Sequence, residues 1–282
     1  MIINNSMQLK ALIKNIAKKK NLPTQPVMQN YLMERLLERI SFTKYKNNFI
    51  IKGGFLIASI VGIEMRSTMD LDIAIKEFDL TYKSIKEAFE EICLVKIADN
   101  INFLVKEITN IREGAEYYGI RVSLIANYPP MKIYLAVDVT TGDKISPKEI
   151  EYSFPLLFEN RSISIMAYNL ETIFAEKLET ILSRNISNTR PRDFYDIYIL
   201  YTLRWHECNL MVLKRALKET ANQRGSSSIL QNFEKIITSI KYNYRMNDFW
   251  LNYQKDFDYA QNVTFENTCD VILNIFQLLR LN

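Results

Sequence analysis

Strand-like segments stop at residue 167, and every strongly patterned segment beyond that point is helical. Upstream of it, short runs rich in β-branched and aromatic residues predict strands, whereas downstream apolar residues recur at helical spacing. Strands that follow one another with few helices between them favour an antiparallel or mixed sheet over a doubly wound parallel one. We therefore expect N-terminal helices at 1–41, an α/β domain at 42–167 and a helical domain at 168–282.

The expected elements follow from these patterns and from the residues that interrupt them. Pro23 and Pro26 separate two N-terminal helices, and Pro129 and Pro130 mark a turn between two strands. Helices are expected at 7–20, 27–41, 55–61, 80–95, 171–183, 192–204, 210–222, 229–242 and 265–279. Strands are expected at 49–52, 70–75, 102–111, 119–126, 132–140 and 162–167.

Composition narrows the class of protein. Hydrophobic residues make up 48% of the 282 residues, enough for a sizeable core. The net charge of +4 is compatible with an anionic partner but carries little weight. The three cysteines form no CxxC pair and the chain has one histidine, so zinc and histidine-rich sites are not expected. The sequence shows neither a secretory signal nor a run of ~18 uncharged apolar residues, so we expect a cytoplasmic protein that does not enter a membrane.

The main chemical signal is the pair Asp70 and Asp72, downstream of Gly53-Gly54. On a strand, residues i and i+2 point to the same face, with Cα atoms roughly 7 Å apart, so the two carboxylates can converge. Their mutual repulsion calls for a cation, and hard oxygen ligands suit Mg²⁺ or Mn²⁺. Asp-x-Asp alone is common on solvated strands, and Gly-Gly alone is more often an ordinary turn than a phosphate-binding one.

Asp138 lies within an otherwise apolar run, Tyr134–Val139, where a carboxylate needs a partner. Three carboxylates on adjacent strands can hold two metal ions about 4 Å apart, which stabilise the attacking and leaving oxygens of an in-line phosphoryl displacement. We therefore expect Asp70, Asp72 and Asp138 to be metal ligands.

The helical half contains two further unusual features. Lys177 lies inside the apolar stripe of the helix expected at 171–183. It is either a lysine at the edge of the stripe with its ammonium in solvent, or a cation that faces an inter-domain cleft and contacts a triphosphate. The segment Arg190–Tyr198 carries Asp193, which could cap its helix, and Asp196, whose aromatic neighbours argue against a solvated surface position.

These motifs occur in a characteristic order: Gly-Gly, Arg-Ser-Thr-Met-Asp-Leu-Asp, Val-Asp-Val, Glu-Lys-Leu-Glu and Arg-Pro-Arg-Asp-Phe-Tyr-Asp-Ile-Tyr. In this the sequence resembles the AbiEii family over residues 49–205. Members are nucleotidyltransferase toxins of type IV toxin–antitoxin systems, related to the mycobacterial MenT toxins. The resemblance implies an α/β (α+β) fold: a polymerase-β-like nucleotidyltransferase core with a small mixed sheet, followed by a helical C-terminal domain.

The resemblance also implies roles for individual residues. Asp70 and Asp72 would bind the metal, and Asp138 corresponds to the third carboxylate less securely. Either Asp193 or Asp196 would be the essential late aspartate, and the sequence does not decide between them. The residues implied to contact the NTP are Gly53, Gly54, Arg66, Ser67, Thr68 and Lys177.

Several members of the family add nucleotides to the 3′ end of tRNA and so block translation. The resemblance therefore implies an RNA acceptor, growth arrest or abortive phage infection, and an antitoxin that represses the operon without needing to bind the toxin. Arg190 and Arg192 are candidate contacts to the RNA backbone. The alternatives are nucleotidyl transfer to a small molecule such as an antibiotic, and a non-catalytic RNA-binding module of the same fold. None of the three carboxylates is missing, which disfavours the last.

Overall fold

The computed structural model describes residue 3 and residues 5–111 and 119–281. The chain forms two compact units. Unit 1 comprises the described residues up to Asp143 together with Ile150–Ala167, and unit 2 comprises Lys144–Glu149 together with the described residues from Tyr168 onward. In the described part of the chain, no helix combines the length and the apolar character needed to cross a membrane.

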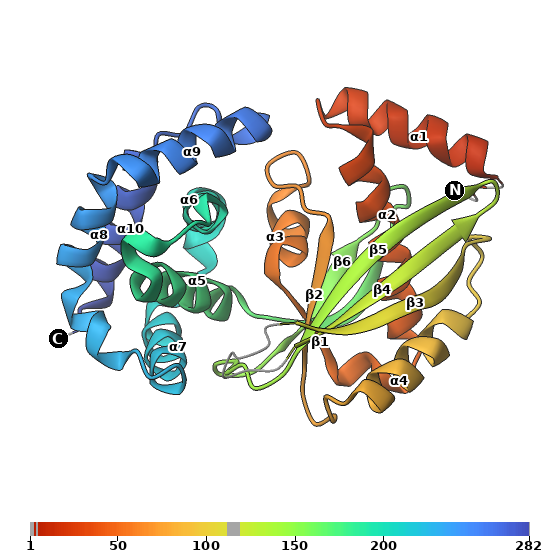
Figure 1. The fold of residues 1–282 in the computed structure, drawn as a ribbon, viewed down its shortest axis with the longest axis horizontal. Coiled ribbons are helices and arrows are strands. Elements are labelled where there is room, and N and C mark those ends of the chain that lie inside the picture. Colours follow the sequence, from red (N-terminus) through yellow and green to blue (C-terminus); the bar gives the residue numbers. More distant parts are fainter. Residues whose placement is uncertain (1–2, 4, 112–118, 282) are drawn as a thin grey trace. The chain divides into compact units, whose positions relative to one another are not determined.

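Unit 1 is built around one sheet. Its strands are β1 (Phe49–Lys52), β2 (Asp70–Ile75), β3 (Asn102–Ile111), β4 (Gly119–Tyr128), β5 (Met131–Thr140), β6 (Ile150–Pro155) and β7 (Ser162–Ala167). Their order in the sheet is β3-β4-β5-β2-β1-β7-β6 (Figure 1). β2 runs parallel to β5 and β1 parallel to β7, whereas the other neighbouring pairs are antiparallel. The mixed sheet expected from the sequence is confirmed.

The described residues of unit 1 also form the α-helices α1 (Ser6–Lys19), α2 (Thr24–Ser41), α3 (Gly53–Val61) and α4 (Tyr82–Leu94). α4 has apolar residues at helical spacing and buries that stripe, which includes Phe89. The Phe89 ring lies 5.9 Å from the ring of Phe49 on β1, so α4 covers the face of the sheet to which Phe49 points. Neighbouring strand residues point to opposite faces, and this leaves Lys52 and its strand partner Asp72 on the other face.

In the described part of unit 2, every regular element is a helix. Unit 2 contains α5 (Leu170–Arg184), α6 (Pro191–Arg204), α7 (Leu210–Gln223), α8 (Phe233–Lys241), α9 (Tyr244–Asp256) and α10 (Phe265–Leu279). Figure 1 shows α9 at the end of this unit opposite to α7. Its core is aromatic: Phe194 of α6 packs edge-on against Phe265 at 5.1 Å, and Trp250 of α9 lies 5.8 Å from the same ring.

The segment Lys144–Glu149 joins two strands of unit 1 but packs within unit 2. The side chain of Asn169 donates hydrogen bonds to the carbonyl oxygens of Ser146 and Lys148, at 2.9 and 2.8 Å. The Ser146 amide donates to Thr172 Oγ1 at 3.1 Å. Because Asn169 also caps α5 through Thr172, the start of that helix and the segment hold each other in place.

Two elements were absent from the sequence-based expectation. β6 is an edge strand whose side chains are mostly exposed apart from Phe154, so its apolar alternation is weak. α9 buries only Met246, Trp250 and Tyr253 along thirteen mostly polar residues. The helix expected at 229–242 is also shorter than predicted, because Ser227–Asn232 forms a 3-10 turn before α8.

Candidate active site

Strand register aligns four charged residues in one row across unit 1. Lys52 pairs with Asp72, Asp72 with Asp138, and Asp138 with Arg121. Paired residues of neighbouring strands point to the same face, so these side chains share the face opposite Phe49. Asp70 is two residues from Asp72 on β2 and joins the same face, where it is exposed. We call these five residues the charged row.

Arg121 was not among the residues singled out from the sequence. Its Nε and Nη2 donate to the two carboxylate oxygens of Asp138 at 2.6 and 2.8 Å, a bidentate pair. The pKa of Arg121 is raised, first by these hydrogen bonds and then by the charges of Asp138, Asp70 and Asp72. Counting outward from the turn at Pro129-Pro130 pairs Arg121 with Asp138, so the sequence did contain the signal once the hairpin was recognised.

Gly53 and Gly54 allow the charged row to approach the start of α3. Gly53 has φ +69°, and a Cβ built there would lie 2.0 Å from Asp72 Oδ2, so only glycine fits. A Cβ on Gly54 would lie 2.8 Å from Arg66 Nη2 and 3.3 Å from Thr68 Oγ1. The structure therefore brings the Gly-Gly turn together with Arg66 and Thr68, which were expected to contact the NTP. It also brings the turn against Asp72, which was expected to bind the metal.

The first backbone N–H groups of α3 are the second feature of this turn. The first turn of a helix has no intrahelical acceptors for its N–H groups and carries a partial positive charge, which suits phosphate oxygens. The residue preceding the helix, Lys52, directs its ammonium to Asp143, with which it forms an ion pair. Asp143 also accepts a hydrogen bond from Thr140 Oγ1 at 3.1 Å. Lys52 and Asp143 are further charged groups at this site that the sequence alone did not reveal.

The donor set fits a hard divalent cation at Asp70 and Asp72. Both supply carboxylate oxygens, the ligands preferred by Mg²⁺ and Mn²⁺, and the exposed side of Asp70 leaves room for substrate phosphates. Asp138 differs, because Arg121 occupies both of its oxygens. Across residue 3 and residues 5–111 and 119–281, no three acidic, histidine or cysteine side chains are arranged as a ready metal cage. The assignment of Asp138 as third ligand stays a prediction.

Unit 2 holds a second charged cluster. Lys177 on α5 pairs with Asp193 at 2.9 Å and with Asp196 at 2.7 Å, both on α6. The Asp196 side chain is 0% exposed and that of Lys177 15% exposed. Burial by itself lowers the pKa of Lys177, but the charges and hydrogen bonds of the two aspartates outweigh it and the pKa is raised. The lysine is charged and is not a side chain reaching into bulk solvent.

Asp193 and Asp196 differ in what remains of their hydrogen-bonding capacity. Asp193 Oδ2 is buried and has no hydrogen-bond partner among the described groups. A buried acceptor without a partner costs free energy unless a donor or cation arrives. Both aspartates contact the lysine, so the structure does not choose between them as the essential residue. Arg192, in the first turn of α6, is exposed, and the backbone amide of Arg190 donates to Asn188 Oδ1 at 2.8 Å.

Comparison with solved structures establishes the fold. A candidate nucleotidyltransferase from H. pylori superposes with a TM-score of 0.51 at 17% identity, over 92% of this chain and 96% of that one. The protein JHP933 from Helicobacter pylori gives a TM-score of 0.53 at 16% identity, over 92% and 93% of the two chains. At these identities the likeness concerns the fold alone. No curated protein matches the sequence.

The family is established by sequence. The model of the family described as "Nucleotidyl transferase AbiEii toxin, Type IV TA system" matches residues 35–268. The chain belongs to this AbiEii family of nucleotidyltransferase toxins. The resemblance inferred from the Gly-Gly, Asp-x-Asp and later motifs is confirmed, and the match extends beyond residues 49–205 on both sides.

Proposed function

We propose that this protein transfers a nucleotidyl group from an NTP to RNA, with the 3′ end of tRNA as acceptor. The observation that carries the proposal is the placement of Asp70 and Asp72 on one strand face, directly beside the glycine turn that begins α3. The turn offers backbone N–H groups for phosphates, and the carboxylates offer oxygens for a metal. Family membership supports nucleotidyl transfer as the reaction class.

In this proposal each group has a defined task. Asp70 and Asp72 hold Mg²⁺ or Mn²⁺, and Asp138 is a candidate third ligand. When bound, the metal polarises the phosphoryl group under attack and favours deprotonation of the attacking hydroxyl. The glycine turn, with Arg66, Ser67 and Thr68, binds the triphosphate.

Two tasks fall to unit 2. Lys177, held charged by two aspartates, contributes a cation to the triphosphate. Arg190 and Arg192 contact the RNA backbone.

Family membership supports a proposal for the biological setting. Blocking the acceptor end of tRNA would stop translation and arrest growth, as in abortive phage infection, and the reaction would take place in the cytoplasm. A cognate antitoxin would repress the operon without necessarily touching this protein. Modification of a small molecule such as an antibiotic is the rival reaction, and it would leave RNA unlabelled.

The test is incubation of the full chain with total RNA, Mg²⁺ and each α-labelled NTP in turn. We expect label in RNA of tRNA size with at least one NTP. Asp72→Asn should lower this labelling by on the order of a thousand-fold, since the metal supplies several kcal/mol of transition-state stabilisation. Asp79→Asn, a charge-matched change at an exposed position, should leave it unchanged. Failure of folded wild-type protein to label any RNA with any NTP would overturn the proposal.

A further inference from the structure

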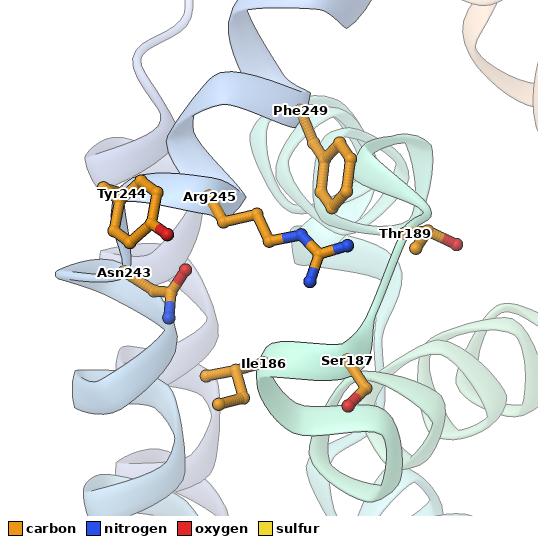
Figure 2. A pocket seen from close by; sticks show the side chains of 7 residues that line it. All are labelled: Ile186, Ser187, Thr189, Asn243, Tyr244, Arg245 and Phe249. Atoms are coloured by element: carbon orange, nitrogen blue, oxygen red, sulfur yellow. The ribbon is translucent and has the colours of Figure 1, made fainter.

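A cavity in unit 2 has the composition of a nucleobase-binding site. It has a volume of about 400 Å³ and lies between the 3-10 turn Asn185–Ser187 and the start of α9 (Figure 2). This volume falls within the roughly 300–1,000 Å³ typical of small-ligand sites. The turn belongs to the connection between α5, which carries Lys177, and α6, which carries its two aspartates.

Hydrogen-bonding groups and a ring line the cavity together. Ser187 and Thr189 line one side of the cavity, and Asn243 lines the other with its amide (Figure 2). Asn243 Oδ1 accepts the Met246 amide at 3.2 Å as the cap of α9, which leaves its NH₂ group as the donor for a ligand. The ring of Phe249 also lines the cavity. Such a mixture suits a flat heterocycle with donors and acceptors at its edge.

Arg245 reaches across the cavity beneath the Phe249 ring, with its Cζ 5.6 Å from the ring centroid (Figure 2). No carboxylate in the described part of the chain pairs with it. An arginine without an ion-pair partner, lying beside an aromatic ring, can bind a phosphate or stack on a base.

Exposed aromatic residues continue beyond the cavity. Tyr244 at its edge is 81% exposed, and Tyr242, at the end of α8, is 76% exposed. Large aromatic side chains this exposed contribute little to folding, but each offers a face on which a base can stack. Tyr242 and Tyr244 are two residues apart in the chain, and two exposed aromatic faces suit consecutive nucleotides of a single strand better than one mononucleotide.

We propose that this cavity binds an unpaired nucleobase of single-stranded RNA, with Tyr244 and Phe249 stacking and Arg245 contacting the adjoining phosphate. The inference rests on the proposed function, because it gives the RNA acceptor a specific site in unit 2. A mononucleotide donor shares the same chemistry, so the experiment must separate the two sources.

The experiment measures binding of a fluorescently labelled single-stranded RNA oligonucleotide to the full chain by anisotropy. Tyr244→Ala should weaken binding by about ten-fold, since it removes the stacking of one base. Arg245→Ala should also weaken it and reduce the log–log salt slope by about 0.7, the value for one phosphate of a single strand. Tyr82→Ala, at a tyrosine of unit 1 that is 57% exposed, and Lys218→Ala on α7 are the matched controls.

The outcomes are distinguishable. RNA affinity that is unchanged in both Tyr244→Ala and Arg245→Ala, or absent in the wild type, overturns the proposal. So does a loss of NTP affinity, measured by competition, in place of a loss of RNA affinity. RNA binding that depends on the cavity, in a protein that labels no RNA with any NTP, supports this site while the proposed transfer fails. RNA labelling that is insensitive to both variants supports the transfer while the site fails.

Discussion

The charged row of unit 1 and the Lys177 cluster of unit 2 differ in how far their charged groups are exposed. Within the charged row of unit 1, Asp70 is exposed and the Arg121 side chain is 41% exposed, although Lys52 is buried. In unit 2 the Lys177 ammonium is enclosed with two aspartates, one of them 0% exposed. Water and counter-ions can replace a partner lost from an exposed pair, but they do so poorly in a buried cluster. Loss of a partner should therefore lower the free energy of unfolding less at Arg121 of the row than at Lys177 of the buried cluster.

The largest expected effect on stability comes from Lys177→Met. This change leaves Asp193 and Asp196 buried without their cation, and breaking a buried pair typically costs about 3–5 kcal/mol. Because the pKa of Lys177 is raised on folding, its contribution is fully present below the unfolded-state pKa of about 10.4 and is lost only as pH rises through the folded pKa. We therefore expect the loss across the neutral range, measured as the free energy of unfolding in urea.

Arg121→Gln provides the contrast. It removes the cation of a partly exposed pair and should lower the free energy of unfolding by no more than about 1 kcal/mol. Equal losses for the two variants would show that exposure does not decide the strength of these clusters, and the distinction between the units would fail.

The sequence predicted those features of the fold and site that depend on neighbouring residues, and missed those that depend on contacts between distant residues. The strand carrying Asp70 and Asp72, the glycine turn and the mixed sheet all follow from short-range patterns. The pairing of Arg121 with Asp138 requires strand register, and the ion pair of Lys52 with Asp143 joins residues 91 positions apart. α9 was not predicted because it has no broad apolar stripe. Its stability comes from tertiary contacts such as the hydrogen bond from Trp250 Nε1 to the Val263 carbonyl at 3.0 Å.

The variant Glu34→Gln tests whether burial of a charged group, and not its location in unit 2, lowers the free energy of unfolding. Glu34, on α2 in unit 1, is 1% exposed, and burial raises its pKa to about 7 from an ordinary value of 4.5. A raised carboxyl pKa gives stability that is present below pH 4.5 and lost as pH rises through about 7. Glu34→Gln should therefore gain about 3 kcal/mol relative to wild type between pH 4.5 and pH 8. Unfolding midpoints across this pH range provide the measurement.

Glu151→Gln is the control of opposite sign. Hydrogen bonds from Ser164 and Lys46 lower the pKa of the exposed Glu151, so its contribution is present at neutral pH and lost as pH falls. The variant should lose stability relative to wild type as pH rises. A gain in both variants would mean that removal of negative charge in general, and not the burial of Glu34, produces the effect.

The last expected effect concerns metal affinity in the charged row. Arg121 shares the field of Asp70, Asp72 and Asp138, so its positive charge opposes a cation bound there. Arg121→Gln should tighten Mn²⁺ binding by about ten-fold, the change expected for about 1.4 kcal/mol of removed repulsion at a partly screened site. Titration of free Mn²⁺ by electron paramagnetic resonance would measure it. Lys83→Gln, the same charge change at a distant exposed lysine, should have no effect, and weaker binding in Arg121→Gln would contradict the assigned repulsion.

The path of the chain through Lys144–Glu149 has a consequence for dissecting the protein. Unit 2 is not one continuous stretch of the chain, since it includes Lys144–Glu149, which precedes β6. Hydrogen bonds join this segment to Asn169 and Thr172 at the start of α5. A fragment beginning at residue 168 would lack the Ser146 and Lys148 carbonyl oxygens that accept from Asn169, and the Ser146 amide that donates to Thr172 Oγ1. A fragment ending at residue 167 would keep the segment but lose what it packs on. A chimaera with a single junction cannot exchange either unit between relatives. Lys144–Glu149 should be transferred together with the helices of unit 2, on which it packs.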